Sequence, residues 1–292
     1  MNYSIADFIL HTEGAHNNIV ECGLNCFKPF EIEGECTAEP TMTLIMDCPI
    51  DEAAYPVTKV IHDFEFEQNY ATGELARFAD GYRFAIKRQD KTFLYIKKDG
   101  SNIVESNLGL AGEVEPGLLR FGLWIMFGIV IAPLGAIAIH SSVVVKEHEA
   151  VLCLGESGPG KSTHTRLWRE NIEGAHLLND DSPILRVVDG TPYAYGSPWS
   201  GKTPCYKNKR LPLAGLVRLS QAPHNKIKRV NTLLAIGALL PSCPHILATD
   251  DALQDEICTT LSQVIATTPV YRLECLPDAE AAALSCKTLF AK

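Results

Sequence analysis

The segment Gly155-Glu-Ser-Gly-Pro-Gly160-Lys161-Ser162 matches the pattern GxxxxGK[S/T], and its flanks predict the fold around it. The apolar run Val151-Leu-Cys-Leu154 before it is typical of a buried strand, and residues 162–172 after it carry a helical pattern. Strand, glycine-rich turn and helix in this order predict a loop whose backbone N–H groups cradle phosphate at the start of a helix. The sequence therefore predicts a nucleotide site in an α/β domain.

Each residue type in this pattern has a chemical reason. Glycines let the backbone turn its N–H groups inward, the lysine ammonium reaches the terminal phosphates, and the serine hydroxyl joins the shell of Mg²⁺. We therefore expect ATP and Mg²⁺ as the cofactors. The residues expected to bind the nucleotide are Gly155, Glu156, Ser157, Gly158, Pro159, Gly160, Lys161, Ser162, Thr163 and Lys202.

A second segment, Gly196-Ser-Pro-Trp-Ser-Gly201-Lys202-Thr203, matches the same pattern without the same flanks. Pro204 follows it directly, and no apolar helical run comes after. Two interpretations stay open. The segment is either a surface turn or a loop that brings Lys202 to a phosphate or an acidic substrate.

Two carboxylates, Asp180 and Asp181, end the apolar run Leu177-Leu-Asn-Asp-Asp, 20 residues after Gly160. That distance leaves room for one helix and a return into a parallel strand, whose carboxyl end lies where ligands bind in such sheets. One carboxylate is expected to hold Mg²⁺ and the other to take the proton of an attacking hydroxyl. The alternative is a turn or helix cap, since Asp-Asp-Ser-Pro is also good turn chemistry.

His140 is placed by hairpin arithmetic. If Glu147-His148 are the two turn residues of a tight hairpin, paired residues sum to 295, and His140 faces Gly155. A histidine there is expected to orient a carboxylate or to stabilise transferred phosphate, unless it is an ordinary strand histidine. The predicted catalytic residues are His140, Lys161, Asp180 and Asp181, and the predicted metal-binding residues are Ser162, Asp180 and Asp181.

Composition divides the chain into two regions. With 46% hydrophobic and 21% charged residues, the 292-residue chain is globular. Residues 1–115 carry a net charge of −11 and residues 116–292 a net charge of +2. We therefore expect a β-rich N-terminal domain over 1–115 and an α/β domain over 116–292. The acidic balance argues against nucleic acid as a partner.

Ten scattered cysteines without a CxxC pair, behind an N-terminus that lacks a signal peptide, indicate reduced thiols and a cytoplasmic protein. A metal cluster of Cys22, Cys26 and Cys36 has poor ligand spacing. The uncharged stretch 121–139 approaches the length of a membrane span, but Pro133 and Gly135 break it, so we expect a buried helix over 118–132 and no membrane contact.

Further elements follow from hydrophobic periodicity. Strands are expected over 41–46, 74–78, 82–87, 92–97, 137–145, 150–154 and 270–276, and helices over 233–240, 252–266 and 278–289. Between residues 201 and 230 the chain has eight Lys or Arg and no acid. This basic cluster is either a solvated face or a surface that receives an acidic protein, a peptide or a second phosphate.

His140, the segment 155–162 and Asn179-Asp-Asp181 together resemble the catalytic domain of the HPr kinase/phosphorylase family, within the phosphoenolpyruvate-carboxykinase-like P-loop fold. The resemblance spans about residues 137–220. It implies phosphoryl transfer from Mg²⁺-ATP to a serine, with His140, Asp180 and Asp181 in the catalytic roles; which aspartate is the base stays open.

The chain departs from that family at 213–219, where the sequence LAGLVRL lacks the expected Glu-x-Arg motif. HPr itself as substrate and the reverse phosphorolysis are therefore in doubt, and the chain looks more like divergent bacterial relatives with GSPWSGK and CYKN segments. We expect an ATP-dependent phosphotransferase acting on a serine of a protein or peptide, or on a small molecule. The alternatives are a nucleotide-sensing regulatory protein without catalysis and a carboxykinase-type enzyme, and a homo-oligomer is left open.

Overall fold

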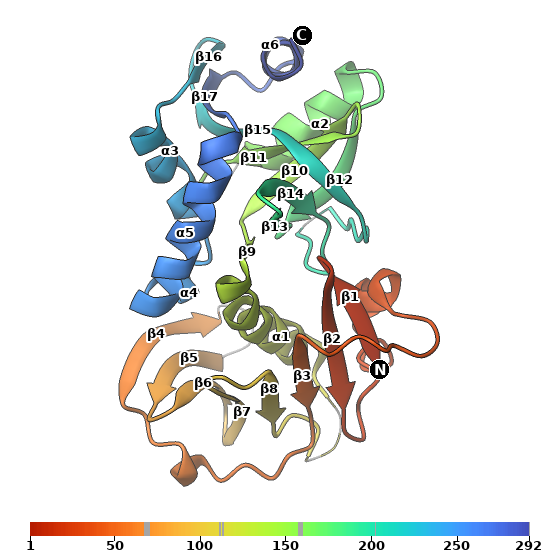
Figure 1. Cartoon of the computed structure of the whole chain (residues 1–292), viewed down its shortest axis with the longest axis vertical. Coiled ribbons are helices and arrows are strands. Elements are labelled where there is room, and N and C mark those ends of the chain that lie inside the picture. The colour runs from red at the N-terminus through yellow and green to blue at the C-terminus, as the bar shows by residue number, and fades with distance from the viewer. Residues whose placement is uncertain (67–70, 111, 113, 157–159, 202, 292) are drawn as a thin grey trace. The chain divides into compact units, whose positions relative to one another are not determined.

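The computed structural model describes residues 1–66, 71–110, 112, 114–156, 160–201 and 203–291. The chain is mixed α/β and divides into two compact units (Figure 1). The first comprises Met1–Val130 with Thr249–Asp251, and the second comprises Ile131–Ala248 with Ala252–Lys292. Each unit is described by itself below.

The first unit is built on an eight-stranded sheet in the order β1-β2-β3-β8-β7-β6-β5-β4. Its strands are β1 (Asn2–Ile5), β2 (Phe8–Glu13), β3 (Met42–Ile45), β4 (Lys59–Phe66), β5 (Ala71–Phe78), β6 (Gly81–Arg88), β7 (Lys91–Lys98) and β8 (Ile103–Ser106). The expected meander is confirmed in β5, β6 and β7, which pair antiparallel in sequence. Two short 3₁₀ helices, η1 (Asn25–Phe30) and η2 (Glu52–Ala54), complete the connections.

The apolar helix α1 (Pro116–Ile131) packs against this sheet, so the unit boundary falls 15 residues later than the predicted boundary at 115. Tyr95 Oη donates to the Leu118 carbonyl at 3.1 Å, and a Cβ on Gly122 would lie 2.1 Å from the Tyr95 ring. Pro116–Leu134 is long and apolar enough to cross a membrane, yet 67% of its apolar window is buried inside the protein. Its apolar surface is therefore covered by protein, as expected for a core helix.

The second unit is built on a nine-stranded sheet whose main path runs β12-β10-β11-β15-β14-β13-β9, with β17 pairing β15 and β16 pairing β17. Its strands are β9 (Ala136–Ala138), β10 (Ser141–Lys146), β11 (Glu149–Leu154), β12 (His176–Asp181), β13 (Ile184–Val188), β14 (Thr191–Tyr195), β15 (Arg210–Gln221), β16 (Lys226–Arg229) and β17 (Val270–Cys275). Its helices are α2 (Lys161–Asn171), α3 (Thr232–Leu239), α4 (His245–Ala248), α5 (Asp251–Thr267) and α6 (Ala279–Leu289), with the 3₁₀ turns η3 (Ala132–Leu134) and η4 (Leu240–Ser242).

The predicted hairpin register is confirmed from Ser142 and Cys153 to the turn, where Glu147 and His148 have φ values of 51° and 67°; the pairing does not extend to His140 and Gly155. The single strand expected over 137–145 is wrong. The chain leaves the sheet between β9 and β10, because the Ile139 N–H donates to the Pro183 carbonyl and the His140 N–H to the Ser242 carbonyl, at 3.1 and 2.7 Å.

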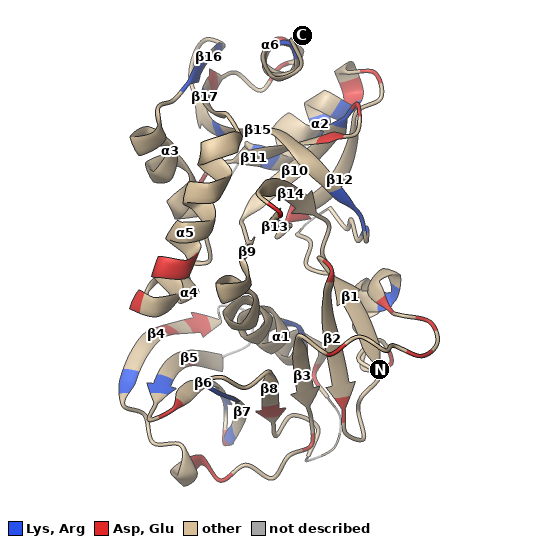
Figure 2. Cartoon of the chain, in the orientation of Figure 1, with Lys and Arg blue, Asp and Glu red and all other residues tan. Residues whose placement is uncertain are grey.

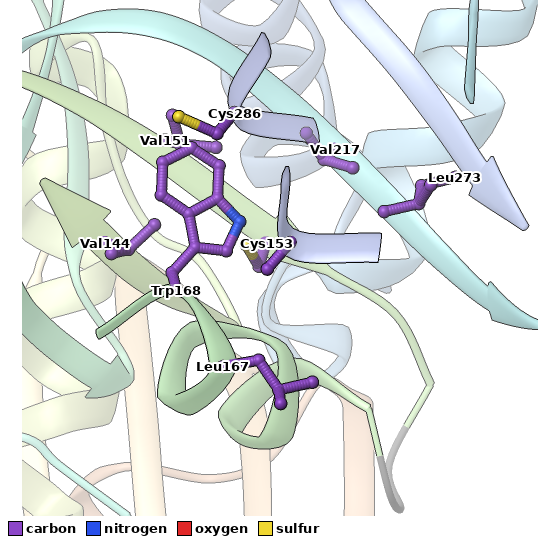
Figure 3. Close-up of a cluster of buried hydrophobic side chains, with 9 residues drawn as sticks. Val144, Val151, Cys153, Leu167, Trp168, Val217, Leu273 and Cys286 are labelled. Atoms are coloured by element: carbon purple, nitrogen blue, oxygen red, sulfur yellow. The ribbon is translucent and has the colours of Figure 1, made fainter. Parts of the chain in front are cut away.

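A buried cluster around Trp168 joins α2 and α6 to one face of this sheet. Val144, Val151, Cys153, Val217 and Leu273 contribute from four strands and Ala282 and Cys286 from α6, as Figure 3 shows in part. Inside it, the Trp168 indole N–H donates to Ser285 Oγ at 2.9 Å. This packing fixes α2, and with it the position of Lys161, relative to the strand ends.

Candidate functional site

The carboxyl ends of several strands meet at one edge of the second sheet. β11, β15 and β17 are parallel neighbours that end at Leu154, Gln221 and Cys275. β12 runs in the same direction, because it pairs antiparallel with β10, which pairs antiparallel with β11. The edge therefore collects the segment after β11, the aspartates that end β12, and His140, which directly precedes β10.

Lys161 is the first residue of α2 and points back over the end of β11. Its ammonium donates to the carbonyls of Gly155 and Glu156 at 3.1 and 3.0 Å, and the residue is 8% exposed. Burial lowers the pKa of Lys161 from its ordinary value, the carboxylates of Asp180 and Asp181 oppose that shift, and the Arg218 guanidinium adds to it. The cation thus lies where an anion would meet both it and the start of α2. Ser157, Gly158 and Pro159 lie outside the described residues.

The two aspartates have different surroundings. Asp180 is 5% exposed, and its Oδ1 accepts a hydrogen bond from Ser162 Oγ at 2.9 Å. The side chain of Asp181 is 42% exposed, and its Oδ1 lies 3.2 Å from His140 Nδ1. The backbone of Asp181 has a φ of 133°, a value that residues other than glycine rarely adopt. The buried carboxylate is therefore tied to α2, and the exposed one is tied to His140.

The segment 196–201 lies directly on the strand end that carries these aspartates. The Gly201 N–H donates to the Asp180 carbonyl at 2.6 Å, Ser200 Oγ donates to the same carbonyl at 3.0 Å, and Ser200 forms a bridge with Asp181. Residues 196–200 are buried, so the interpretation of this segment as a surface turn is wrong. Lys202, the residue on which the other interpretation depends, lies outside the described residues.

Asn179 holds this segment in place from inside the protein. Its Nδ2 donates to the carbonyls of Ser197 and Trp199 at 3.3 and 3.2 Å, and its Oδ1 accepts from the Ser182 N–H at 3.1 Å. Asn179 is fully buried. The Asn179 side chain therefore closes the turn after β12, which contains the strained residue Asp181, and also joins that turn to the segment 196–201.

A cavity of about 840 Å³ opens beside Lys161. One wall is formed by the residues around the start of α2, among them the predicted Gly155, Glu156, Gly160 and Thr163. The other wall is formed by the ends of β15 and β17 and includes Arg218 and Arg272. Its volume is in the range of small-molecule sites.

Two residues at this cavity escaped the sequence analysis as site residues. Arg218 was recognised only as part of the basic cluster, and Arg272 had no signal beyond being a cation within a predicted strand. Their position depends on strand pairing, because Arg218 and Arg272 are Cα partners in the parallel pair β15–β17.

No family model matches this chain, and no curated protein matches it. Among solved structures, the chain is similar to the HPr(Ser) kinase/phosphatase from Coxiella burnetii, with 13% sequence identity and a TM-score of 0.30 over 52% of this chain and 92% of that one. A TM-score this low carries no argument about activity, so the account of the site rests on its own geometry.

Proposed function

We propose that the second unit transfers the terminal phosphoryl group of ATP to a hydroxyl, a serine of a protein or peptide or a hydroxyl of a small molecule, within a phosphoenolpyruvate-carboxykinase-like P-loop fold. One observation carries the proposal. Lys161, the Ser162–Asp180 pair and the His140–Asp181 pair meet at one sheet edge beside a cavity large enough for a nucleotide. Phosphoryl transfer uses a cation that binds the phosphates, oxygen ligands for Mg²⁺ and a carboxylate that accepts the proton of the attacking hydroxyl.

The Ser162–Asp180 pair fits a magnesium ion that arrives with the nucleotide. Mg²⁺ is held by one or two carboxylates together with substrate phosphates and water. Among the described residues, no group of three or more His, Cys, Asp or Glu is placed to hold a metal by itself. A bound Mg²⁺ would neutralise charge on the phosphates, while Ser162 and Asp180 supply two oxygen ligands from the protein.

Asp181 acts as the general base. It is the more exposed of the two aspartates, and His140, whose Nδ1 lies 3.2 Å from Asp181 Oδ1, orients its carboxylate. The acceptor hydroxyl gives its proton to Asp181 while the acceptor oxygen forms a bond to the terminal phosphorus. The bond between that phosphorus and the bridging oxygen of ATP breaks at the same time, and ADP is released. Lys161 stabilises the negative charge on the transferred group.

The test is incubation with Mg²⁺ and ATP labelled in its terminal phosphate, in a bacterial lysate that keeps its small molecules, with wild type, Lys161→Ala and Asp181→Asn in parallel. The proposal expects wild type to form an acid-stable phosphate ester on one or a few species, and both variants to lose that label. Label that appears only as inorganic phosphate, or equally with all three proteins, would overturn the proposal. Binding of ATP without turnover would favour a nucleotide-sensing protein instead.

A further inference from the structure

Three basic side chains form a row across neighbouring strands of the second sheet. Arg218 on β15 is the Cα partner of Arg272 on β17, and Arg272 is the partner of Lys228 on β16. Partners in register point to the same face, where like charges destabilise a sheet. The acid on the same face of β17, Glu274, lies two residues further and has its Oε2 3.2 Å from His224 Nε2. Figure 2 shows basic residues on β16. An anion bound beside the row would offset the repulsion between these charges.

Two members of the row line the cavity that contains Lys161. The Arg218 Nη1 donates to the Ala238 carbonyl at 2.9 Å, which fixes the guanidinium at the wall. The Arg272 side chain forms no hydrogen bond or ion pair with any residue that the structure describes. Arg218 is close enough to Lys161 to lower the pKa of that ammonium, although burial is the larger cause. Lys161, Arg218 and Arg272 all line this one cavity, so an anion bound in it has three cations within its walls.

The order of the strands places the functional residues in a line along the edge of the sheet. The aspartates lie on β12, Lys161 follows β11, and the arginines lie on β15 and β17, in the spatial order β12-β10-β11-β15-β17. In phosphoryl transfer the leaving oxygen lies opposite the attacking oxygen. An acceptor at Asp181 therefore requires the rest of the nucleotide to extend from Lys161 towards Arg218 and Arg272.

We propose that Arg218 and Arg272 bind the α-phosphate side of the nucleoside triphosphate whose terminal phosphate lies at Lys161, with the nucleoside against the apolar wall of Leu219, Leu276 and Pro277. This inference rests on the proposed function. It adds the direction in which the ligand lies in the cavity and identifies the ligand as a nucleoside triphosphate. The ligand is a nucleotide rather than a bare polyphosphate, because only a nucleotide offers an α-phosphate to the arginines and a nucleoside to the apolar wall.

The test compares ligands that do and do not reach the arginines. Titration calorimetry measures the affinities of ATP and of pyrophosphate, each with Mg²⁺, for wild type, Arg272→Ala, Lys228→Ala and Lys161→Ala. Lys228→Ala is the matched control, since it removes a charge from the same row without lining the cavity. Arg272 is exposed, so its replacement should not affect folding, and a thermal melt of each variant checks this.

The proposal expects Arg272→Ala to weaken ATP about tenfold, as for the loss of a charge-assisted phosphate contact, and to leave pyrophosphate within about twofold. It expects Lys228→Ala to leave both affinities within about twofold. Unchanged ATP binding by Arg272→Ala, equal weakening of pyrophosphate, or equal weakening by Lys228→Ala would each overturn it. If Lys161→Ala leaves both ligands unaffected, the proposed function fails instead.

Discussion

Ser162 Oγ donates a hydrogen bond to Asp180 Oδ1 at 2.9 Å, joining the first turn of α2 to the end of β12. The neighbouring Asp181 makes no such link to α2 in the described structure and lies instead 3.2 Å from His140. Adjacent carboxylates thus have separate surroundings, one buried beside a hydroxyl and one exposed beside an imidazole. This difference supports separate roles for Asp180 and Asp181.

The first prediction separates these roles by matched substitutions. Asp181→Asn is expected to lower the rate of phosphoryl transfer by about 100-fold or more, since it removes a general base, with ATP affinity little changed. Asp180→Asn is expected to raise the Mg²⁺ concentration needed for half-maximal rate, because it removes an oxygen ligand. Initial rates over a Mg²⁺ titration measure both effects. Identical Mg²⁺ dependence in the two variants would contradict the assignment.

The second prediction concerns His164, which is buried between α2 and α6. Its Nε2 lies 3.0 Å from Ser285 Oγ and accepts from the Trp168 indole N–H at 3.2 Å, and burial lowers its pKa from 6.5 to about 4. Unfolded chains bind this proton below about pH 6.5, and the folded protein does not until about pH 4. Stability contributed by the neutral ring is therefore present above pH 6.5 and is lost as the pH falls towards 4.

Urea unfolding of wild type and His164→Gln between pH 7 and pH 4.5 measures this effect. Glutamine keeps an amide oxygen that can accept from Trp168 but does not titrate. Between pH 6.5 and pH 4.5 the histidine contributes about 2 kcal/mol to the loss of stability, and the variant is expected to lose correspondingly less over that range. Parallel pH profiles for the two proteins would show that His164 does not titrate in this way.

The third prediction tests the buried segment 196–200 through its first glycine. A Cβ on Gly196 would lie 1.9 Å from the Lys207 carbonyl oxygen, so Gly196→Ala must displace the backbone of Gly196 or of Lys207. We expect it to lower the free energy of unfolding by about 2 kcal/mol or more. Gly237→Ala is the control, because a Cβ there meets nothing within 4 Å in α3, and we expect it to be neutral or stabilising by up to about 1 kcal/mol. Chemical denaturation compares the two; equal effects would refute the close packing.

Local patterns in the sequence predicted much of the fold. The hairpin of β10 and β11 has the expected register because a two-residue turn between two apolar runs specifies it locally. The meander β5–β6–β7 and the helices α3, α5 and α6 follow from the same kind of signal. The break between β9 and β10 escaped prediction, because it depends on carbonyls of Pro183 and Ser242, which are distant in sequence.

The predicted site residues are those that carry a short motif or, like His140, follow from a hairpin register. The segment 155–162 and the aspartates carry short motifs, and the structure brings Ser162 to Asp180. Burial of the segment 196–200 depends on the amide of Asn179, and the position of Arg272 at the cavity depends on strand pairing with β15. Both are tertiary relationships without a local pattern, so periodicity could not reveal them.

The most direct measurement is the affinity of Mg²⁺-ATP for wild type and Lys161→Ala by titration calorimetry, with a thermal melt of each protein as the folding control. Lys161 donates to two carbonyls at the end of β11, from where its ammonium can reach the terminal phosphates of the proposed nucleotide. We expect saturable binding to wild type and a loss of affinity of about 100-fold or more in the folded variant. Equal affinity in the two proteins, or no binding of ATP to wild type, would contradict it.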